Sequence, residues 1–495
     1  MEKERPDLTI PAEFVDYRRR LIGYSDARSE PERLQLEFER LFLSLKKFGA
    51  NDTRMMFEIG SIAVQVFYMG DERFEVGEVI AVVQPGFPNI RLEPDARMAV
   101  LQQAVDDRLY PQQWALRRVE VEPAWDRIAE VGPRAVTVAV VDSGIKQNHE
   151  DLNQARINGA RVIPPNNNNF ADDTGHGTML AGTIAAVTDN VIGIAGIAGE
   201  VSNLRIFAIK FTDSRTPPTA LAAVLGILTA VTAGARVINA SWHVLEDTGL
   251  LAGAILYAGT QGCLFVAAAG NNGGNNTRVP TLPASYDFDN MIVVMASDEN
   301  DNKAWFSNYG ADVELAAPGI RILSTGLYYV NPAYRDYNGT SAAAAHVSGA
   351  AAMLLELDDW TPHELREHLV ASAEPVRSLR GICRANGRLN LRRAVLGPFA
   401  IDKPILGEQL QRGATYRVEW HSEYVAPIVN SVEILFIDQD TGLVLSQFGG
   451  FPNNGRRNVV VPNQAIARAI VRVRCEQKNL YADSATFEII SDLVI

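Results

Sequence analysis

The sequence predicts an α/β body with a mostly parallel sheet and helices on both faces, flanked by a small N-terminal α+β domain and a C-terminal antiparallel β-sandwich. Two patterns lead to this prediction. Short apolar runs such as AVTVAVVD, LRIFAIKF, ARVINASW, CLFVAAAG and MIVVMAS alternate with helical stretches such as ALAAVLGILTAVTAG, as in parallel sheets that are buried on both faces. Near the C-terminus, TYRVEW, SVEILFI, LVLSQFG, NVVV and AIVRVR are short strand-like runs between turn residues, as in antiparallel sandwiches.

The N-terminal residues carry the weakest pattern. Residues 30–47 (EPERLQLEFERLFLSLKK) place Leu and Phe at helical spacing, while IAVQVFYM and EVIAVVQ have the composition of strands. Together they predict a small α+β domain over residues 1–105. The α/β body then covers 106–396, a linker containing Pro and Gly covers 397–408 (GPFAIDKPILGE), and the sandwich covers 409–495.

One helix of the body has a complete start signal. In TPHELREHLVASA, residues 361–373, Thr361 precedes Pro362, and Glu364 follows three positions after Thr361. A threonine cap with a glutamate at this spacing is a capping box, and proline suits the first helical position. The segment therefore predicts a surface helix that begins directly after Thr361.

The composition argues against several classes of function. The chain has 495 residues, of which 47% are hydrophobic and 21% charged, and its net charge is −13. An acidic chain is a poor general binder of nucleic acid or of anionic membranes, because phosphate binding needs clustered Lys and Arg. The three cysteines, Cys263, Cys383 and Cys475, are widely spaced, so neither a disulfide framework nor a cysteine zinc site is predicted. Cys263, in the apolar run GCLFVAAAG, is expected to be a buried core thiol.

No targeting or membrane segment is visible. The beginning of the chain, MEKERPDLTIPAEF, lacks the apolar core of a secretory signal, and no run of eighteen apolar residues occurs. We therefore expect a soluble protein without a membrane partner. It would be cytoplasmic unless a leader has been removed or export follows a route that this sequence does not reveal.

Two polar residues stand at the ends of buried elements in the body. Asp142 in VAVVDSGI follows an apolar strand, and a carboxylate at the C-terminal end of a parallel strand faces the crevice where such sheets bind ligands. His176 in DDTGHGTMLAGTIAA stands between two glycines at the start of a small-residue helix, where glycine allows close backbone approach. Taken alone, Asp142 could cap the next turn and His176 could be structural.

Two more polar residues occupy comparable positions later in the chain. Asn271 in VAAAGNNGG follows another buried strand, so its amide N–H could face the same crevice. Ser341 in NGTSAAAAHVSG falls in the first turn of an alanine-rich helix, where unpaired N–H groups and the helix dipole favour negative charge. The alternatives are a turn asparagine and an N-cap serine that only accepts a hydrogen bond.

The motifs DSG, GHGT, AAAGN and NGTSAAAAHVSG together resemble the signatures of the subtilisin-like serine protease family. The chain order Asp, His, Ser is also that of the family. Three longer segments, YPQQWALRRVEVEPAWD, WFSNYGADVELAAPGIRILST and GRLNLRRAV, resemble further parts of the family. The resemblance covers about 105–396 and implies a subtilisin-like fold.

This resemblance implies a serine endopeptidase with an acyl-enzyme mechanism. Ser341 would be the nucleophile, His176 the general base and later the general acid, and Asp142 the residue that holds the tautomer of His176. Asn271 and the Ser341 backbone N–H would form the oxyanion hole. Two alternatives stay open at this point: a catalytically silent peptide-binding or scaffold protein of the same fold, and an esterase with the same triad.

The sequence departs from the family pattern at three positions. Ala342 stands where the family usually has methionine or another larger residue, Ala345 where it usually has proline, and His243 where it typically has glycine. The segment VINASWH resembles the strand that pairs with an extended substrate in this family. The expected partner is a protein or peptide substrate, with tolerance for apolar side chains. The expected substrate-binding residues are Ser241, Trp242, His243 and Gly270.

A structural calcium site is also implied by the resemblance. Asp151 in HEDL stands where the family has a calcium ligand, and AAVTDNVIGIAG resembles the family's loop of asparagine and backbone carbonyl ligands. Ligation by oxygen alone is what Ca²⁺ selects. A solvated turn without an ion is the alternative interpretation. The expected ligands are Asp151, Asn190, Val187 and Ile192, with Asp189 as an alternative in a shifted register.

The flanking domains are less clearly defined in function. Residues 1–105 occupy the place of the family's N-terminal prosegment, which assists folding and blocks the cleft until it is cleaved. An intramolecular inhibitory segment removed by self-processing is one expectation; a permanent regulatory domain and a partner-binding module are the others. The C-terminal sandwich resembles accessory domains of secreted proteases, whose role would be binding or stability.

Overall fold

The chain forms two compact units, one of residues 1–102 with 437–444 and the other of residues 103–436 with 445–495. The limits predicted above for the separate domains stay a prediction. The computed structural model describes residues 20–26, 31–48, 50–59, 62–69, 83, 90–94, 105–129, 134–153, 156–165, 167–247, 249–327, 333–397, 399–405, 407–422, 431–475, 477–478 and 480–490.

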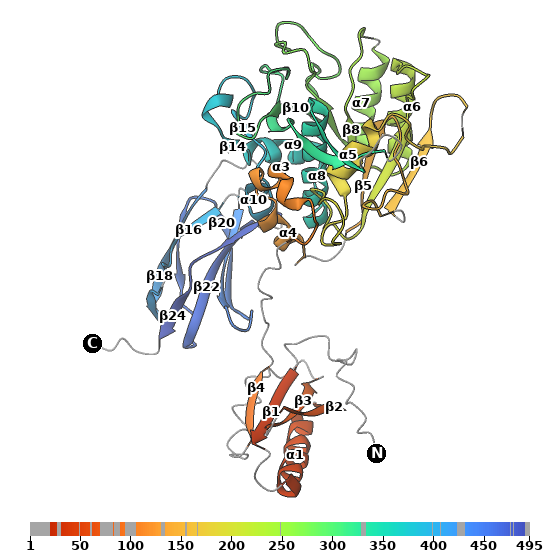
Figure 1. Cartoon of the computed structure of the whole chain (residues 1–495). Helices are drawn as coiled ribbons and strands as arrows, with labels where there is room; N and C mark the ends of the chain where they lie inside the picture. The colour runs from red at the N-terminus through yellow and green to blue at the C-terminus, as the bar shows by residue number, and fades with distance from the viewer. Residues whose placement is uncertain are drawn as a thin grey trace, which may run out of the picture. The chain divides into compact units, whose positions relative to one another are not determined.

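The N-terminal part combines a helix with a four-stranded antiparallel sheet (Figure 1). The elements are β1 (Arg20–Asp26), α1 (Pro31–Leu45), η3 (Lys46–Phe48), β2 (Ala50–Ile59), β3 (Ile62–Met69) and β4 (Arg91–Pro94). The strand order is β2-β3-β1-β4. On α1, residues spaced three and four apart are buried, as a one-sided helix requires. The predicted helix and the strand IAVQVFYM are present, whereas EVIAVVQ lies, apart from Val83, outside the described residues.

A nine-stranded sheet forms the centre of the larger unit. Its strands are β5 (Val136–Asp142), β6 (Ile157–Arg161), β7 (Leu204–Lys210), β8 (Val237–Ala240), β9 (Leu264–Ala268), β10 (Met291–Ser297), β11 (Leu315–Pro318), β14 (Glu374–Pro375) and β15 (Gly387–Arg388). The order is β14-β15-β11-β10-β9-β8-β5-β7-β6. Neighbours are parallel except β14 and β15 at one edge. This confirms the mostly parallel sheet.

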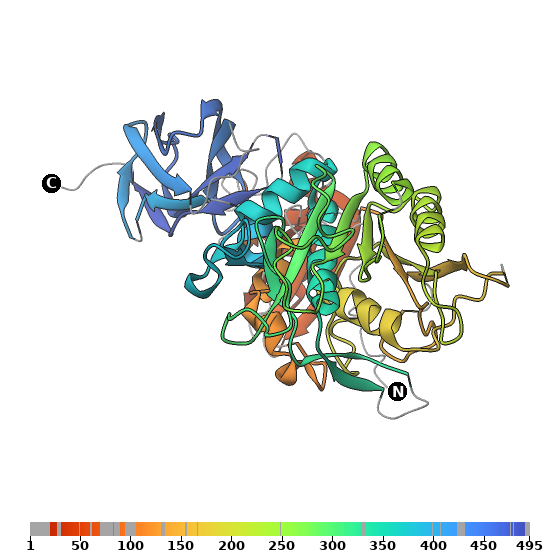
Figure 2. The same ribbon diagram turned by 90° about the horizontal axis from the view of Figure 1, so that it is seen from above.

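Helices cover both faces of this sheet, as predicted (Figure 2). Side chains alternate between faces along a strand. The helices are α3 (Trp114–Arg118), α4 (Glu122–Ala129), α5 (His176–Ala185), α6 (Ala220–Thr232), α7 (Leu250–Thr260), α8 (Thr340–Leu357), α9 (Pro362–Ala371) and α10 (Leu391–Leu396), with short turns η5 (Tyr110–Gln112) and η8 (Arg377–Leu379). Because of the alternation, Val136, Val138 and Val140 of β5 belong to a buried cluster with α5 and α8, whereas Ala139 and Val141 belong to a cluster with α6 and α7.

The start of α9 has the predicted capping box. Thr361 Oγ1 accepts a hydrogen bond from Glu364 N at 3.2 Å, and Glu364 Oε2 accepts one from Thr361 N at 2.9 Å. Cys263 is buried, as expected for a core thiol. Among the helices that the structure describes, none has the length and apolar character needed to cross a membrane.

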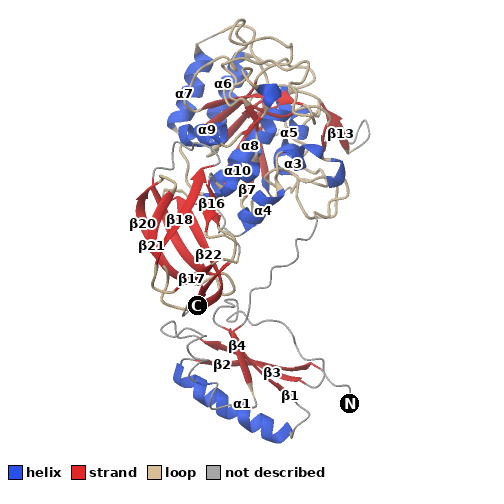
Figure 3. Ribbon diagram, turned by 90° about the vertical axis from the view of Figure 1, so that its left-hand side faces the viewer, coloured by secondary structure: helices blue, strands red, loops and turns tan. Residues whose placement is uncertain are grey.

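Two β-sheets make up the C-terminal part (Figure 3). The strands are β16 (Phe399–Lys403), β17 (Gln409–Gln411), β18 (Thr415–Ser422), β19 (Ser431–Asp438), β20 (Val444–Pro452), β21 (Arg456–Val460), β22 (Ile466–Cys475), β23 (Tyr481–Asp483) and β24 (Phe487–Ile490). One sheet has the order β16-β18-β21, and the other β17-β24-β22-β19-β20 with β23 beside β22. Trp420 of the first sheet and Phe436 of the second are both buried, and the mainly antiparallel sheets of a C-terminal β domain are confirmed, whereas their packing as a sandwich stays a prediction.

Two details of this part differ from the prediction. The segment 397–408, expected to be a linker, contains β16, which pairs with β18. Pro and Gly flank this short run, but pairing with a neighbouring strand is enough to make it a strand. In addition, β17 runs parallel to β24, not antiparallel. The two strands lie far apart in the sequence, so no hairpin turn imposes an antiparallel direction.

Candidate active site

The buried carboxylate of Asp142 is hydrogen-bonded to the half-buried imidazole of His176. Asp142 is the last residue of β5 and is 4% exposed, and His176 is the first residue of α5. The Asp142 Oδ1 atom accepts hydrogen bonds from His176 Nδ1 at 2.8 Å and from Ser143 N at 2.8 Å. The charge of Asp142 raises the pKa of His176 above its usual 6.5, against the opposing effect of burial. Asp142 thus does more than cap a turn.

Glycine is required where α5 approaches the loop after Asp142. A Cβ atom on Gly177 would lie 2.2 Å from the carbonyl oxygen of Gly144. Any larger residue would therefore push the start of α5, and with it His176, away from the carboxylate. Gly175, on the other side of His176, has φ +91°, which favours glycine. The two glycines around His176 are therefore needed to keep its ring beside the carboxylate of Asp142.

Ser341 is the second residue of α8, after the N-cap residue Gly339. The interpretation of Ser341 as an N-cap serine is therefore wrong, whereas its predicted place in the first turn is confirmed. Its side chain is buried, and Oγ donates to the Ser241 carbonyl at 3.5 Å. Within the described residues, Ser341 and His176 share no hydrogen bond. Such bonds are often long before a substrate is bound.

Asn271 lies beside Ser341, the candidate nucleophile. Its Oδ1 atom accepts hydrogen bonds from Thr340 N and Thr340 Oγ1, both at 2.9 Å, so the amide group is held in one orientation. A point built as a Cβ atom on Gly339 lies 3.8 Å from Asn271 Nδ2 and 3.6 Å from Ser341 N. Both nitrogen atoms therefore adjoin the same point beside Gly339. That arrangement can bind a developing negative charge.

The expected substrate-binding residues differ in their surroundings. Ser241 Oγ donates to the Ser341 carbonyl at 3.3 Å, and Gly270 N donates to Thr340 Oγ1 at 3.2 Å, so Ser241 contacts Ser341 and Gly270 contacts the residue before it. Trp242 Nε1 donates to the Val141 carbonyl at 3.0 Å, and its ring packs against Phe211 and Phe265 of the body. His243 is exposed. Trp242 thus anchors this segment to the sheet.

Of the residues expected to bind calcium, Val187, Asn190 and Ile192 lie in the loop after α5, and Asp151 contacts this loop from the segment before α5. Asp151 is fully buried, and its Oδ1 atom accepts from Asn190 Nδ2 at 3.0 Å. Val187 N donates to the Asp151 carbonyl at 3.0 Å, and Ile192 N donates to Asn190 Oδ1 at 2.7 Å. Burial raises the pKa of Asp151 to about 7. An ionised Asp151 therefore lacks the solvation that water would give it.

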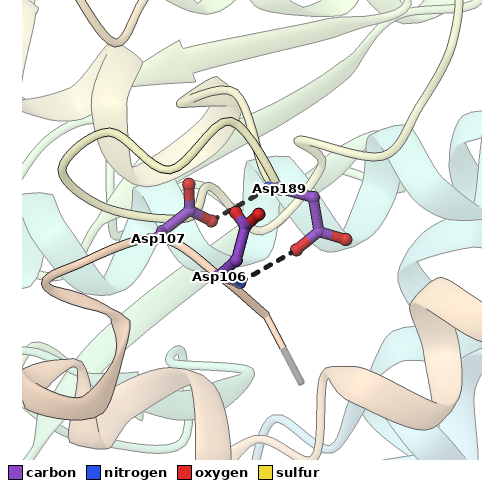
Figure 4. Close-up of side chains that lie close together, drawn as sticks. All are labelled: Asp106, Asp107 and Asp189. Atoms are coloured by element: carbon purple, nitrogen blue, oxygen red, sulfur yellow. Dashed lines mark hydrogen bonds between the residues drawn. The ribbon is translucent and has the colours of Figure 1, made fainter. Parts of the chain in front are cut away.

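Two carboxylates not singled out from the sequence, Asp106 and Asp107, lie beside Asp189 of this loop, the residue expected as an alternative ligand (Figure 4). Asp106, Asp107 and Asp189 bring carboxylate oxygens within 4.8 Å of one another. Asp107 is 1% exposed and accepts from the backbone N–H groups of Asp189 at 3.0 Å and Asn190 at 3.2 Å. Burial raises the pKa of Asp107, and its charge contributes to the raised pKa of Asp151. Buried oxygens of this kind suit a hard cation such as Ca²⁺.

Comparisons with known proteins concern the α/β body. A family model described as the subtilase family matches residues 133–397. Thermitase of Thermoactinomyces vulgaris is 37% identical over 283 residues, which are 57% of this chain and 95% of that protein. Subtilisin Savinase of Lederbergia lenta is 35% identical over 266 residues, 54% of this chain and 92% of that protein. A solved structure of proteases from Pseudoalteromonas arctica PAMC 21717 aligns with a TM-score of 0.52 and 27% identity, over 59% of this chain and 99% of its own.

Proposed function

The chain belongs to the subtilase family and is a serine endopeptidase, and we propose that Asp142, His176 and Ser341 are its catalytic triad. The observation that carries this assignment is the 2.8 Å contact between His176 Nδ1 and Asp142 Oδ1. A carboxylate can only accept there, so Nδ1 carries the proton and Nε2 is left as the base.

In the proposed reaction, Ser341 Oγ attacks the peptide carbonyl carbon while His176 Nε2 takes the hydroxyl proton. The tetrahedral intermediate places its negative oxygen between Asn271 Nδ2 and Ser341 N. The C–N bond then breaks as His176 returns the proton to the leaving amine, which leaves an acyl-enzyme. Water attacks the ester with His176 again as base, and the acid product departs as Ser341 regains its proton.

Ser341 Oγ must first leave the Ser241 carbonyl. Their separation of 3.5 Å is at the limit of a hydrogen bond, so rotation of the serine side chain costs little. The peptide would lie extended along the segment of Ser241 to His243, with its backbone paired to the protein and its side chains read by the neighbouring surface. Protein and peptide substrates are accordingly the proposed class.

A calcium ion would be held by the acidic residues beside the loop after α5. Asp107 and Asp151 are buried carboxylates with raised pKa values, which is the condition that a bound divalent cation relieves. When bound, the ion supplies positive charge that fixes the loop. The proposed ligands are Asp107, Asp151, Asp189 and Asn190, with carbonyl groups of Val187 and Ile192.

The proposed function is tested by comparing the wild-type protein with Ser341→Ala. We expect the wild type to bind a fluorophosphonate covalently and to cleave an unfolded protein, and Ser341→Ala to lose labelling and at least about a thousandfold of the activity. A correctly folded wild type that neither reacts nor cleaves would favour the silent scaffold. Sequencing of new N-termini in both proteins tests self-processing of the N-terminal segment, because cleavage in both alike would exclude it.

A further inference from the structure

A second carboxylate, Asp172, lies buried at the start of α5. It is 8% exposed and accepts hydrogen bonds through both oxygens. Its Oδ1 atom accepts from Ser143 Oγ at 2.8 Å and from the N–H groups of Thr174 and Gly175 at 3.0 Å, with Thr174 Oγ1 at 3.4 Å. Its Oδ2 atom accepts from Thr178 N at 2.9 Å and Thr178 Oγ1 at 2.6 Å. Asp172 therefore ties the loop before α5 to its first turn.

Ser143 connects this carboxylate to the acid–base pair. Its hydroxyl donates to Asp172 Oδ1 and accepts from Gly177 N at 3.0 Å, while its own N–H donates to Asp142 Oδ1. The same Asp142 oxygen receives His176 Nδ1. The backbone around His176 and the carboxylate that faces it are thus fixed to each other through one serine and one buried aspartate.

A buried cation beside this network is paired with another carboxylate. Lys210 is 2% exposed and donates to Asp173 Oδ1 at 2.6 Å and to the carbonyls of Ser143 and Ala171. Among the described residues, Asp172 forms no ion pair. After the larger effect of Asp142, the charge of Asp172 also raises the pKa of His176.

We propose that Asp172, acting through Ser143, is a positioning residue that holds His176 against Asp142 and whose charge stabilises the imidazolium formed during the reaction. This inference rests on the proposed function, in which His176 is the base. A role as helix cap alone would also explain the hydrogen bonds to Thr174, Gly175 and Thr178. It would not require the protonation of His176 to depend on the charge of Asp172.

The charge is tested with Asp172→Asn, which keeps the shape of the side chain. We expect the midpoint of His176 titration to fall by about 0.5–1 pH unit, because a nearby negative charge is lost. The measurement is NMR of the full chain labelled at its histidines, with the His176 signal identified by its absence in His176→Gln. Asp287→Asn, which removes an exposed carboxylate, is the matched control and should leave the midpoint unchanged.

The connection is tested with Ser143→Ala, which cuts the hydroxyl bridge and keeps the charge. Here we expect the His176 midpoint to stay within about 0.2 pH units while kcat falls about tenfold with little change in KM, since a displaced base acts on the reacting atoms. Thermal unfolding of each variant checks that it is folded. Unchanged kcat in a folded and active Ser143→Ala protein would overturn the positioning role.

The outcomes separate this inference from the proposed function. An unchanged His176 midpoint in folded Asp172→Asn would overturn the inference, whether or not the protein cleaves peptides. If Asp172→Asn does not fold, Asp172→Glu serves instead: it keeps the charge, so an unshifted midpoint supports the proposal and a lowered one contradicts it. If the His176 midpoint shifts in Asp172→Asn but the wild-type protein never reacts with fluorophosphonate, the electrostatic effect of Asp172 on His176 is supported. Only the proposed catalytic role of the triad is then contradicted.

Discussion

Two helices begin at the proposed active site, and they begin in opposite ways. At the start of α5, the first N–H groups all have acceptors: Gly177 N donates to Ser143 Oγ and Thr178 N to Asp172 Oδ2, while His176 N lies 3.4 Å from Thr174 Oγ1. At the start of α8, Thr340 N donates to Asn271 Oδ1, but Ser341 N donates no hydrogen bond within the described residues. We call the start of α5 closed, because its first N–H groups have acceptors, and the start of α8 open, because Ser341 N has none among the described residues.

The difference matches the tasks of the two residues that these helices carry. A helix start has unpaired N–H groups and partial positive charge, which attract an anion. In α5 the carboxylate of Asp172 occupies that position and holds the backbone before His176, the proposed base. In α8 the position is free for the negative charge that the proposed reaction would create. The same local physics would then position one group and stabilise the transition state at the other.

The open start is tested most strongly at Asn271. We expect Asn271→Ala to lower kcat by about 10²- to 10³-fold, the range typical of losing one oxyanion donor, with KM changed less than about threefold. Steady-state kinetics on a peptide substrate measure both quantities. Asn272→Ala is the matched control, because Asn272 is exposed and, among the residues that the structure describes, forms a hydrogen bond to Asn308 Oδ1 through its backbone N–H and none through its side chain.

If Asn271→Ala kept kcat within about fivefold of the wild type, the open start of α8 would not be the oxyanion site. The comparison between the two helix starts would then lose its functional meaning. Equal losses in both variants would point to a disturbed loop instead.

The second prediction concerns the proposed calcium site at the opposite end of α5. The expected effect of calcium on Tm is of intermediate size. Without an ion, the folded chain binds a proton at Asp151 more tightly than the unfolded chain, because the pKa is raised from 3.8 to about 7. The resulting stability is present below pH 4 and is lost as pH rises to about 7. Calcium competes with that proton. We therefore expect calcium to raise Tm by several degrees at pH 8 and by much less at pH 5.

Thermal unfolding with calcium or a chelator at both pH values measures this effect. Asp151→Asn should lose most of the calcium response at pH 8, whereas Asp402→Asn, at an exposed carboxylate of the C-terminal part, should keep it. A calcium response of the same size at both pH values would contradict the assignment of Asp151 as a ligand.

The sequence predicted what depends on local pattern. The apolar runs predicted the strands of the parallel sheet, because strands buried on both faces must be apolar throughout. The polar residues at their ends stood out for the same reason, and Asp142 and His176 do meet. The capping box at Thr361 was readable because its two partners are three residues apart.

Contacts between segments far apart in the chain could not be predicted from the sequence. Asp107 meets Asp189 across 82 residues, and nothing in the spacing of the two indicates it. Asp172 stands four residues before His176, inside a motif that was already quoted, but its burial and its bond to Ser143 depend on tertiary packing. The strand β16 inside the expected linker likewise depends on its partner β18.

The smallest expected effect concerns a third helix start, that of α9. Its first N–H groups are paired by the capping box of Thr361 and Glu364, and it lies outside the proposed active site. Thr361→Ala removes the hydroxyl that accepts from Glu364 N, so we expect a loss of about 1 kcal/mol in the free energy of unfolding and about 1–3 °C in Tm. Thr361→Ser keeps the hydroxyl and should lose much less. Neither variant should change kcat or the His176 midpoint, because this cap serves stability alone. A drop in kcat in folded Thr361→Ala would show that a closed helix start remote from the triad also controls catalysis, and the contrast between α5 and α8 would then be too narrow an explanation.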